Sequence, residues 1–358
     1  MQILFIVHRY YPHIGGIEYL VKSIAEHLAK NKHSIIVLTG EPGLKELTEE
    51  EINKVAIIRW PTLTFNEGYH VPLRRSELAK MLHKIVKDVD VIHVHNVHAI
   101  MPMYCLNILI KNPVWKVLTP YYHGTGHGVI SRSLWPFWRN YIRKIVKKVN
   151  VIHVVSYLEK NIVERNFNVK AELIENGVDE ELIKTSWKPE DYIMYSGRIE
   201  KYKNCQRLVN VVKILNQEFG LNLKLKMFGE GSYKRVLERL LRQADITYEL
   251  HSFQPFEKYV ENLSKASAFA LLSGKESYPQ TVNEANAIGV PVIVAEPWGI
   301  NFARRKRVLV INLAEGDKEI ASKIAKFLVR AKEEPRPRVP TWNEVTREYV
   351  RKLYKIGG

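Results

Sequence analysis

The chain has 358 residues, which favours two domains of roughly 150–200 residues each over a single domain. Its composition, 46% hydrophobic and 26% charged, excludes a disordered chain, and no apolar run reaches the roughly 20 residues that a membrane-spanning helix needs. The formal net charge of +16 favours partners that carry phosphate groups, whereas two cysteines exclude a disulfide framework and indicate a reducing, cytoplasmic setting.

The first half of the chain alternates strand and helix patterns. Residues 3–7 form an apolar run that indicates a buried strand rather than a signal peptide. Apolar residues then recur at helical spacing from Ile17 to Leu28. Further strands are predicted at Ser34–Leu38, near Val55–Ile58, and at Val91–His95, Val114–Leu118 and Val151–Val155. With helical patterns between most of them, this order predicts a doubly wound parallel sheet.

The alternation pauses between residues 175 and 190 and then starts again. Strands are predicted at Asp191–Ser196, Leu223–Phe228, Ile246–Leu250, Ala268–Leu272 and Val290–Ala295, and a helix at Asn204–Phe219. A proline-rich stretch at 334–340 leads into a last predicted helix, Trp342–Lys355. We therefore expect two α/β domains, 1–175 and 190–335, joined by a hinge.

A glycine-containing loop, with Gly15 and Gly16, follows the first predicted strand and leads into a helix. Glycines in this position let backbone amides approach an anion at the positive end of the helix. The sequence is neither G-x-G-x-x-G nor G-x-x-x-x-G-K-[ST], which excludes the dinucleotide and P-loop motifs. A simple tight turn explains this loop equally well.

Histidines cluster in two places. His93, His95 and His98 could suggest a metal site, but no carboxylate or cysteine is close in sequence, and we favour strand-end histidines that line a cleft. The second group, His123 to Gly128, is too rich in glycine for a zinc-binding helix. A polar loop after a strand belongs at the mouth of an α/β sheet, where ligands bind.

Two cations follow the first strand of the second domain. Arg198 comes directly after Gly197, and Lys203 opens the next helix. A guanidinium fork and a lysine point charge could together clamp a diphosphate, although two solvated surface cations are an equally good interpretation. The loop Gly229–Gly231 follows another strand in the same way.

Two glutamates, Glu276 and Glu284, stand eight residues apart, the first in a loop and the second on the following helix. Carboxylates accept hydrogen bonds from pairs of sugar hydroxyls, each worth about 1.5–3 kcal/mol. Small residues on the same helix, Ala285, Ala287 and Gly289, would keep it close to its sheet. From spacing alone, two exposed glutamates remain the simpler interpretation.

In this order the segments resemble the family 4 glycosyltransferases, retaining enzymes with the two-domain GT-B fold. The motifs that carry the resemblance are Pro12–Gly16, Asp90–His95, His123-Gly124, Ile174–Asp179, Ser196–Arg198 with Lys203, Glu276–Glu284, and Trp342 with Val345 and Tyr349. Each motif is modest, but seven in the family's order are specific. The resemblance implies two Rossmann-like domains that face a central cleft, the first closed by the helix 342–358.

The resemblance also implies a role for each site residue. Arg198 and Lys203 would hold the donor diphosphate, Glu276 the donor-sugar hydroxyls, and Glu284 the ribose. His123 would face the reacting sugar. Backbone amides near the phosphate or acceptor would come from Gly15, Gly16, Gln280, Thr281 and Val282. Catalysis would rest on positioning and charge stabilisation, with no enzyme nucleophile, no metal and no other cofactor.

Three departures from the family pattern stand out. Glu175 replaces a proline in the hinge motif. Pro279 stands where many members have glycine, which removes one backbone donor near the donor phosphate. The stretch 296–306 does not match the family's glycine-rich segment, so donor contacts there do not carry over.

The implied partners are a UDP-, GDP- or ADP-linked sugar and a glycan or lipid-linked acceptor. Residues 131–150 hold six basic side chains and no acidic one, interleaved with aromatics. Such a helix could bind an anionic membrane surface and make the protein peripheral at the cytoplasmic face. The alternative is an ordinary domain helix with its apolar face on the sheet.

Three other functions remain open. A GT-B nucleotide-sugar epimerase would keep the nucleotide site and need no acceptor cleft. An inactive sugar-binding homologue would lack turnover, although all the mapped site residues are present. The charge of +16 also suggests a nucleic-acid-binding protein, but no recognition helix, zinc finger or RNP motif supports it, so no nucleic-acid partner is expected.

Overall fold

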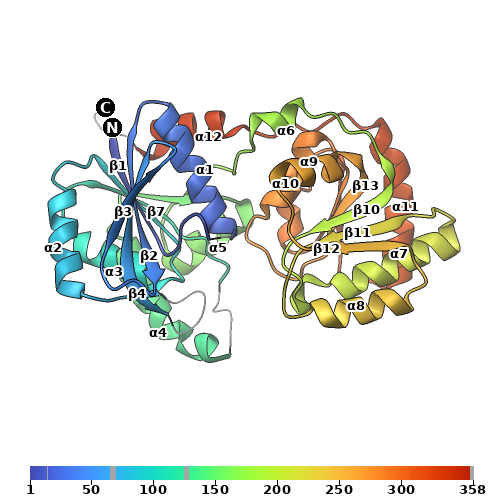
Figure 1. Ribbon diagram of the computed structural model, residues 1–358, viewed down its shortest axis with the longest axis horizontal. Coiled ribbons are helices and arrows are strands. Elements are labelled where there is room, and N and C mark those ends of the chain that lie inside the picture. Colours follow the sequence, from blue (N-terminus) through green and yellow to red (C-terminus); the bar gives the residue numbers. More distant parts are fainter. Residues whose placement is uncertain (14, 65–69, 125–128, 355–358) are drawn as a thin grey trace. The chain divides into compact units, whose positions relative to one another are not determined.

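The computed structural model describes residues 1–13, 15–64, 70–124 and 129–354, apart from the side chains of 129–134. It divides into two compact units, Met1–Asn176 with Trp342–Gly358, and Gly177–Thr341 (Figure 1). The expected hinge segment belongs to the second unit, because Val178 pairs with Thr341 and helix α6 (Glu180–Lys184) packs against α10 (Gln280–Ile288).

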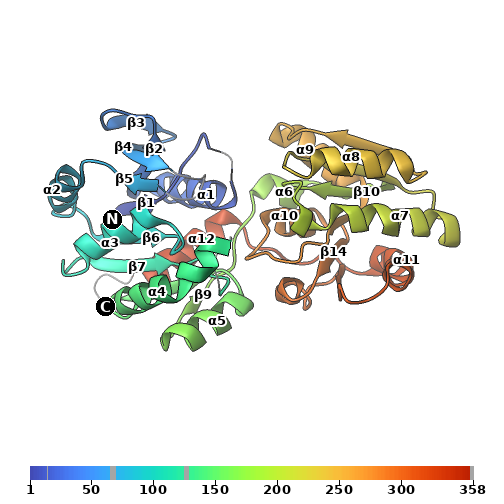
Figure 2. The same ribbon diagram turned by 90° about the horizontal axis from the view of Figure 1, so that it is seen from below.

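A mostly parallel sheet forms the centre of the first unit, in the order β3-β4-β2-β1-β6-β7-β8-β9 with β5 on β4 (Figure 2). Its strands are β1 (Gln2–Val7), β2 (Ser34–Pro42), β3 (Thr48–Ile52), β4 (Val55–Thr64), β5 (His70–Pro72), β6 (Val91–His95), β7 (Trp115–Thr119), β8 (Val151–Val154) and β9 (Glu172–Leu173). Strands β3 and β5 run antiparallel to β4. The parallel core matches the prediction, whereas these two strands were not expected.

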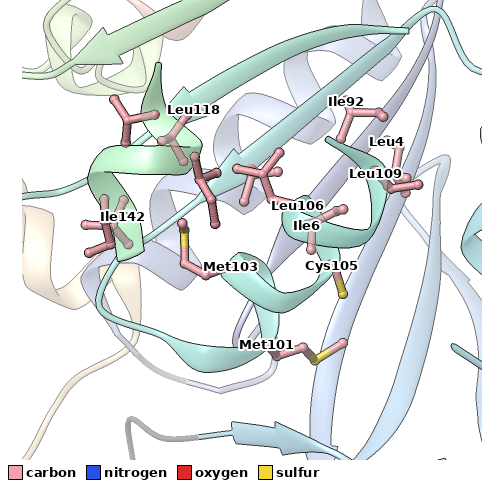
Figure 3. Close-up of a cluster of buried hydrophobic side chains, with 14 of the residues drawn as sticks. Leu4, Ile6, Ile92, Met101, Met103, Cys105, Leu106, Leu109, Leu118 and Ile142 are labelled. Carbon is pink, nitrogen blue, oxygen red and sulfur yellow. The ribbon is translucent and has the colours of Figure 1, made fainter. Parts of the chain in front are cut away.

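The helices of this unit are α1 (Gly16–Lys30), α2 (Arg75–Ile85), α3 (Ile100–Leu109), α4 (Val129–Val146) and α5 (Tyr157–Phe167). Helix α3 is apolar on nearly all sides, and its side chains meet those of β1, β6 and β7 in a buried cluster (Figure 3). Such burial stabilises the unit by about 1.5–3 kcal/mol for each large side chain. It also fixes the carboxyl ends of the parallel strands, where ligands bind in α/β sheets.

The C-terminal segment completes the first unit. Helix α12 (Trp342–Glu348) packs against α1 and continues as a π-helical turn, Tyr349–Leu353. Trp342 is fully buried, and the indole of Trp115 donates to the carbonyl of Leu353 at 2.7 Å. The last helix was predicted as Trp342–Lys355, and its final residue lies outside the described part of the chain.

The second unit is a parallel sheet in the order β12-β11-β10-β13-β14-β15. The strands are β10 (Glu190–Ser196), β11 (Lys224–Phe228), β12 (Tyr248–His251), β13 (Ala266–Leu271), β14 (Val292–Ala295) and β15 (Val308–Ile311), and the helices besides α6 and α10 are α7 (Cys205–Phe219), α8 (Lys234–Gln243), α9 (Phe256–Lys265) and α11 (Asp317–Glu333). Helix α7 packs against α8 and α11, and α9 against α10, on opposite faces (Figure 1). The strand order reverses at β10 and β13, which is where such sheets bind ligands.

Helix α4 holds most of the basic segment 131–150, and its apolar residues belong to the core. Ile142, Ile145 and Val146 are buried, as is Trp135. The interleaved pattern is therefore mainly that of an ordinary domain helix, with Phe137 as its exposed aromatic residue at 77%. Within the described residues, no helix is long and apolar enough to cross a membrane.

Candidate active site

Two glycine-containing loops pack backbone to backbone at the carboxyl edge of the second sheet. A Cβ on Gly229 would lie 1.9 Å from the carbonyl oxygen of Gly197, and one on Gly231 would lie 2.2 Å from that of Ile199. The backbone also has φ of +151° at Gly229 and +159° at Gly231, which other residues rarely adopt. The amide of Ile199 donates to the carbonyl of Glu230 at 2.8 Å, so the loop that carries Arg198 is held firmly.

Lys203 and Glu276 meet at the point where the strand order reverses. Lys203 closes a short 3₁₀ turn before α7, and Glu276 lies in the loop between β13 and α10. The ammonium donates to Oε1 of Glu276, and the two side chains are only 12% and 14% exposed. The structure thus brings together two of the predicted site residues as a partly buried ion pair, in which the interaction is stronger than in open water.

Arg198 joins this pair through Tyr202, a residue that the sequence analysis did not single out. Arg198 is exposed, and its Nη2 donates to the Tyr202 hydroxyl at 3.3 Å. The Lys203 ammonium lies 5.3 Å from the centre of the same ring. The sequence did contain a signal for Tyr202, because it is an aromatic residue between Arg198 and Lys203, and the face of an aromatic ring attracts cations.

Glu284 is buried on α10 rather than exposed on the helix surface. It is 5% exposed, and the Tyr259 hydroxyl on α9 donates to its Oε2 at 2.8 Å. Burial raises the pKa of Glu284 to about 7, because the ionised carboxylate loses solvation, and the charge of Asp179 acts in the same direction. Only the spacing of the two glutamates was visible in the sequence, and Tyr259 was missed.

The start of α10 offers fewer backbone donors than expected. The amide of Val282 donates to the carbonyl of Pro279 at 3.2 Å, so it is already engaged. Gln280 and Thr281 lie in the first turn, where helical hydrogen bonding leaves N–H groups without an acceptor in the helix. The Gln280 side chain donates to the carbonyl of Gly177 at 2.7 Å, which ties it to the chain at the start of the second unit.

The unusual stretch 296–306 braces α10. Arg305 donates to the side chain of Asn283 at 2.7 Å and to the hydroxyl of Tyr278 at 2.8 Å, while Trp298 is fully buried beside β14. The departure from the family pattern therefore supplies a structural support for the E-x7-E element. No local sequence signal could have found Arg305, because its side-chain partners lie 19 to 27 residues earlier.

Gly15 and Gly16 behave differently at the start of α1 in the first unit. The Glu18 carboxylate folds back onto Gly15, where a Cβ would lie 2.2 Å from Oε2, and it also lies 3.6 Å from Nε2 of His8. A Cβ on Gly16 would meet nothing within 4 Å. A negative charge already lies beside Gly15, so Gly16 is the better placed of the two amides for an anion.

Two of the three histidines that we expected to line a cleft are buried instead. His93 and His95 are fully buried and stacked at 4.2 Å, which makes that expectation wrong. His93 instead bonds the hydroxyls of Tyr354 at 2.8 Å and Thr119 at 2.7 Å. Phe5 packs against both rings, and Tyr349 and Tyr354 of the C-terminal segment cover His93, which the sequence pattern could not predict.

His98 and His123 lie together. Their rings stack at 4.4 Å, and His98 also stacks on Trp135 at 4.7 Å. His123 is half-buried, and the rest of its loop, 125–128, lies outside the described residues. In the described part of the chain, no group of three or more His, Cys, Asp or Glu side chains is arranged to hold a metal ion.

The chain matches two family models, Glycosyltransferase Family 4 over residues 14–182 and Glycosyl transferases group 1 over residues 178–335. It is 25% identical to N-acetyl-alpha-D-glucosaminyl L-malate synthase of Bacillus anthracis over 81% of this chain and 78% of that protein. It is 22% identical to the GDP-mannose-dependent alpha-mannosyltransferase of Mycolicibacterium smegmatis, over 84% and 80% of the two chains.

The fold also matches solved structures. The Anabaena protein Alr3699/HepE in complex with UDP superposes with a TM-score of 0.73 at 13% identity, over 99% of this chain and 100% of that one. The chain therefore belongs to the family 4 glycosyltransferases with the GT-B fold, and it is an enzyme that uses nucleotide-sugar donors. The family and the fold class inferred from the sequence are confirmed.

Proposed function

We propose that this enzyme is a retaining hexosyltransferase that moves a sugar from a nucleotide-diphosphate sugar to an acceptor hydroxyl. The observation that carries the proposal is the contact of Lys203 with Glu276, beside Arg198 and Tyr202, at the edge where the strand order reverses. One end of this group suits a diphosphate and the other suits sugar hydroxyls, so a nucleotide sugar would span both.

In the proposed reaction, Arg198 and Lys203 stabilise the charge that grows on the diphosphate as the bond from the anomeric carbon to the phosphate oxygen breaks. The acceptor hydroxyl attacks that carbon from the same face, and its proton passes to the departing phosphate oxygen. Glu276 orients the sugar through its hydroxyls, and His123 faces the reacting sugar. No protein nucleophile takes part, so the rate enhancement comes from positioning and charge stabilisation.

The nucleotide half of the donor would lie against α10. Glu284 accepts the ribose hydroxyls, while the amides of Gln280 and Thr281 serve phosphate oxygens. One relative is named as GDP-mannose-dependent and one structural neighbour holds UDP, which supports a purine or pyrimidine diphosphate donor and leaves UDP, GDP and ADP as the bases to test. The two cations neutralise the diphosphate in this proposal, so no metal is needed.

The anomeric configuration of the product tests the proposal. We expect the new glycosidic bond to keep the donor's α configuration, and we expect EDTA to leave the rate unchanged, because Arg198 and Lys203 supply the positive charge. Proton NMR of the fresh product gives the first result, and initial rates with and without EDTA give the second. A β product would refute retention, and a strict need for Mg²⁺ would refute metal independence.

We also propose that the acceptor is lipid-linked or membrane-proximal and that the enzyme works at the cytoplasmic face of a membrane. Arg143 and Lys144 are exposed in the last turn of α4, Lys147 and Lys148 are exposed directly after it, and Phe137 is exposed on the same helix. Near an anionic surface each such cation contributes about 1 kcal/mol. The other aromatic side chains described on this helix pack inward. The attraction of the helix to an anionic membrane would therefore be mainly electrostatic, and it would weaken as the salt concentration rises.

A further inference from the structure

A further cation, Arg9, lies at the carboxyl edge of the first sheet. Arg9 lies two residues after the end of β1, and its Nε donates to Nε2 of His70 at 3.1 Å. Because arginine only donates, Nε2 must be the accepting nitrogen, so His70 is neutral with its proton on Nδ1. That nitrogen lies 3.0 Å from the hydroxyl oxygen of Thr62, which accepts the hydrogen bond.

The support behind Arg9 is tightly packed. His70 is fully buried and Thr62 nearly so, and both lie against Gly40 of β2. A Cβ on Gly40 would come within 2.9 Å of the Thr62 methyl and 3.2 Å of Nδ1 of His70. A glycine is therefore required at this position for His70 to sit where it holds Arg9. The guanidinium is anchored through Nε, and its two terminal nitrogens remain for another partner.

Among the residues that the structure describes, no carboxylate pairs with Arg9. Arg59, in the same unit, is paired with Glu41 at 3.3 Å and with Glu50 at 2.6 Å. Arg9 is half-buried, and among the described residues it forms no ion pair and its terminal nitrogens donate to nothing. A guanidinium that is partly removed from water and has no counter-charge favours an anion, and its two terminal nitrogens match a phosphate or carboxylate.

The surroundings of Arg9 also suit a ligand. His8, the preceding residue, lies next to Asn96, which follows β6, with their nitrogens 3.4 Å apart. Burial lowers the pKa of His8 to about 3, so His8 adds a neutral imidazole rather than a second charge. The carboxyl ends of neighbouring parallel strands thus present Arg9 as a fixed cation beside a neutral imidazole and an amide, at the edge where α/β sheets bind ligands. The Glu18 carboxylate lies on the other side of His8, 3.6 Å from its Nε2, and forms no ion pair with Arg9.

We propose that Arg9 is an anion-binding residue for the acceptor, and that the acceptor carries a phosphate or carboxylate group. The inference rests on the proposed glycosyltransfer, in which the first unit serves the acceptor and the second unit the donor. The Arg9 fork binds the acceptor's anionic group, and the neighbouring neutral groups leave room for hydroxyl contacts. An uncharged acceptor would leave the Arg9 charge unmatched and would bind more weakly.

Calorimetry with small probes tests this proposal. The Arg198→Ala/Lys203→Ala double variant serves as the starting protein, because it removes the phosphate site expected in the second unit. Inorganic phosphate, glucose 6-phosphate, L-malate and glucose are titrated into it with and without Arg9→Gln. We expect Arg9→Gln to weaken binding of glucose 6-phosphate or of malate about 10- to 100-fold, and comparison of these two probes identifies the anionic group.

Matched variants separate a local effect from a general one. Arg165→Gln removes an exposed arginine of α5 in the same unit, and it should change every affinity less than about twofold. Arg9→Met keeps the aliphatic stem and takes the place of Arg9→Gln if that variant does not fold. The inference is overturned if no anionic probe binds, or if the anions bind as tightly without Arg9 as with it.

Donor binding is measured separately on the otherwise unmodified protein. UDP- and GDP-sugars should bind Arg9→Gln as tightly as the parent, since Arg9 is not among the proposed donor-binding residues. Equal loss of donor and acceptor-probe binding would mean that Arg9 serves the donor, and the inference would be wrong. If no nucleotide sugar binds the parent protein while Arg9-dependent anion binding persists, the proposed function fails and the anion site stands.

Discussion

Lys203 and Glu276 lie 73 residues apart in the chain and contact each other at the sheet edge. In a donor complex the Lys203 ammonium would be shared between this carboxylate and the diphosphate, so the pair couples sugar recognition to leaving-group stabilisation. The partial burial of both groups makes that coupling stronger than it would be at a fully solvated surface.

Loss of either cation should therefore slow the reaction sharply. We expect Arg198→Ala or Lys203→Ala to reduce kcat about 10²- to 10³-fold, as removal of a donor aimed at developing charge does elsewhere. Both variants should fold, since both positions lie at element ends. Steady-state kinetics and circular dichroism check the two expectations. Lys201→Ala, which removes an exposed cation from the same turn, is the control. If either variant kept a kcat close to that of the parent protein, the substituted residue would not belong to the active site.

The two glutamates should affect different parts of the donor. Glu284→Ala should weaken free nucleotide and nucleotide sugar alike, because Glu284 would hold the ribose. Glu276→Ala should leave free nucleotide unchanged and impair the sugar-dependent step. Isothermal calorimetry distinguishes these effects, with Glu257→Ala on the surface of α9 as a control. The opposite pattern would show that the two assignments are exchanged.

At the scale of single elements, α4 tests the membrane proposal. Sedimentation with anionic vesicles at low salt should pellet the protein, and replacing Arg143, Lys144, Lys147 and Lys148 with glutamine should abolish the effect. Each removed cation contributes about 1 kcal/mol, so the combined loss is large. A fourfold replacement of Lys234, Arg235, Arg239 and Arg242 on α8 provides a control of equal charge. If the variant with the four glutamines pelleted with the vesicles as much as the parent protein does, this helix would be excluded as the membrane contact.

Across the whole molecule, buried histidines should make stability depend on pH. Burial lowers the pKa of His95 to about 3 and of His153 to about 4, and it holds that of His93 well below its usual value. Below the unfolded value of about 6.5, the unfolded chain binds protons that the folded protein does not, so stability falls as pH falls from 6.5 towards 4. Glu159 and Glu284, whose pKa values burial raises to about 7, oppose this trend in part.

Urea unfolding at pH 7.5, 6 and 5 measures this dependence. His95→Leu should reduce the dependence of stability on pH by up to about 1.4 kcal/mol per pH unit below 6.5, the value for one proton. His83→Leu, at an exposed position on α2, should leave the dependence unchanged. An unaltered slope in His95→Leu would contradict the assignment of this buried imidazole as neutral.

Much of the fold could be predicted from the sequence, because buried parallel strands are continuous apolar runs. Strand β3 was missed since Thr48–Ile52 is mostly acidic and exposed, and its pairing with β4 depends on a turn that apolar periodicity does not mark. Strands β5 and β9 were missed because they have only three and two residues, and β15 was missed as well. Such short segments are recognisable only from their neighbours.

The chemistry-bearing residues of the site could also be predicted, but their supports could not. Arg198, Lys203 and Glu276 belong to motifs that can be recognised from the local sequence. Tyr259 and Arg305 contact the site from other elements, and nothing near them in sequence marks that contact. The orientation of Glu18 onto Gly15 likewise depends on helix geometry rather than on residue type.

The path of the chain has a consequence for the order in which the protein is made. The first unit needs Trp342 to Tyr354 to cover His93 and His153, yet the whole second unit is encoded before these residues. The pairing of Val178 with Thr341 closes the second unit on itself. The ribosome adds about 5–20 residues per second, so about 10–30 s pass between synthesis of the last strand of the first sheet and synthesis of the C-terminal segment that covers it. The domain that begins first is the domain that finishes last, and chaperones would meet its uncovered strands in that interval.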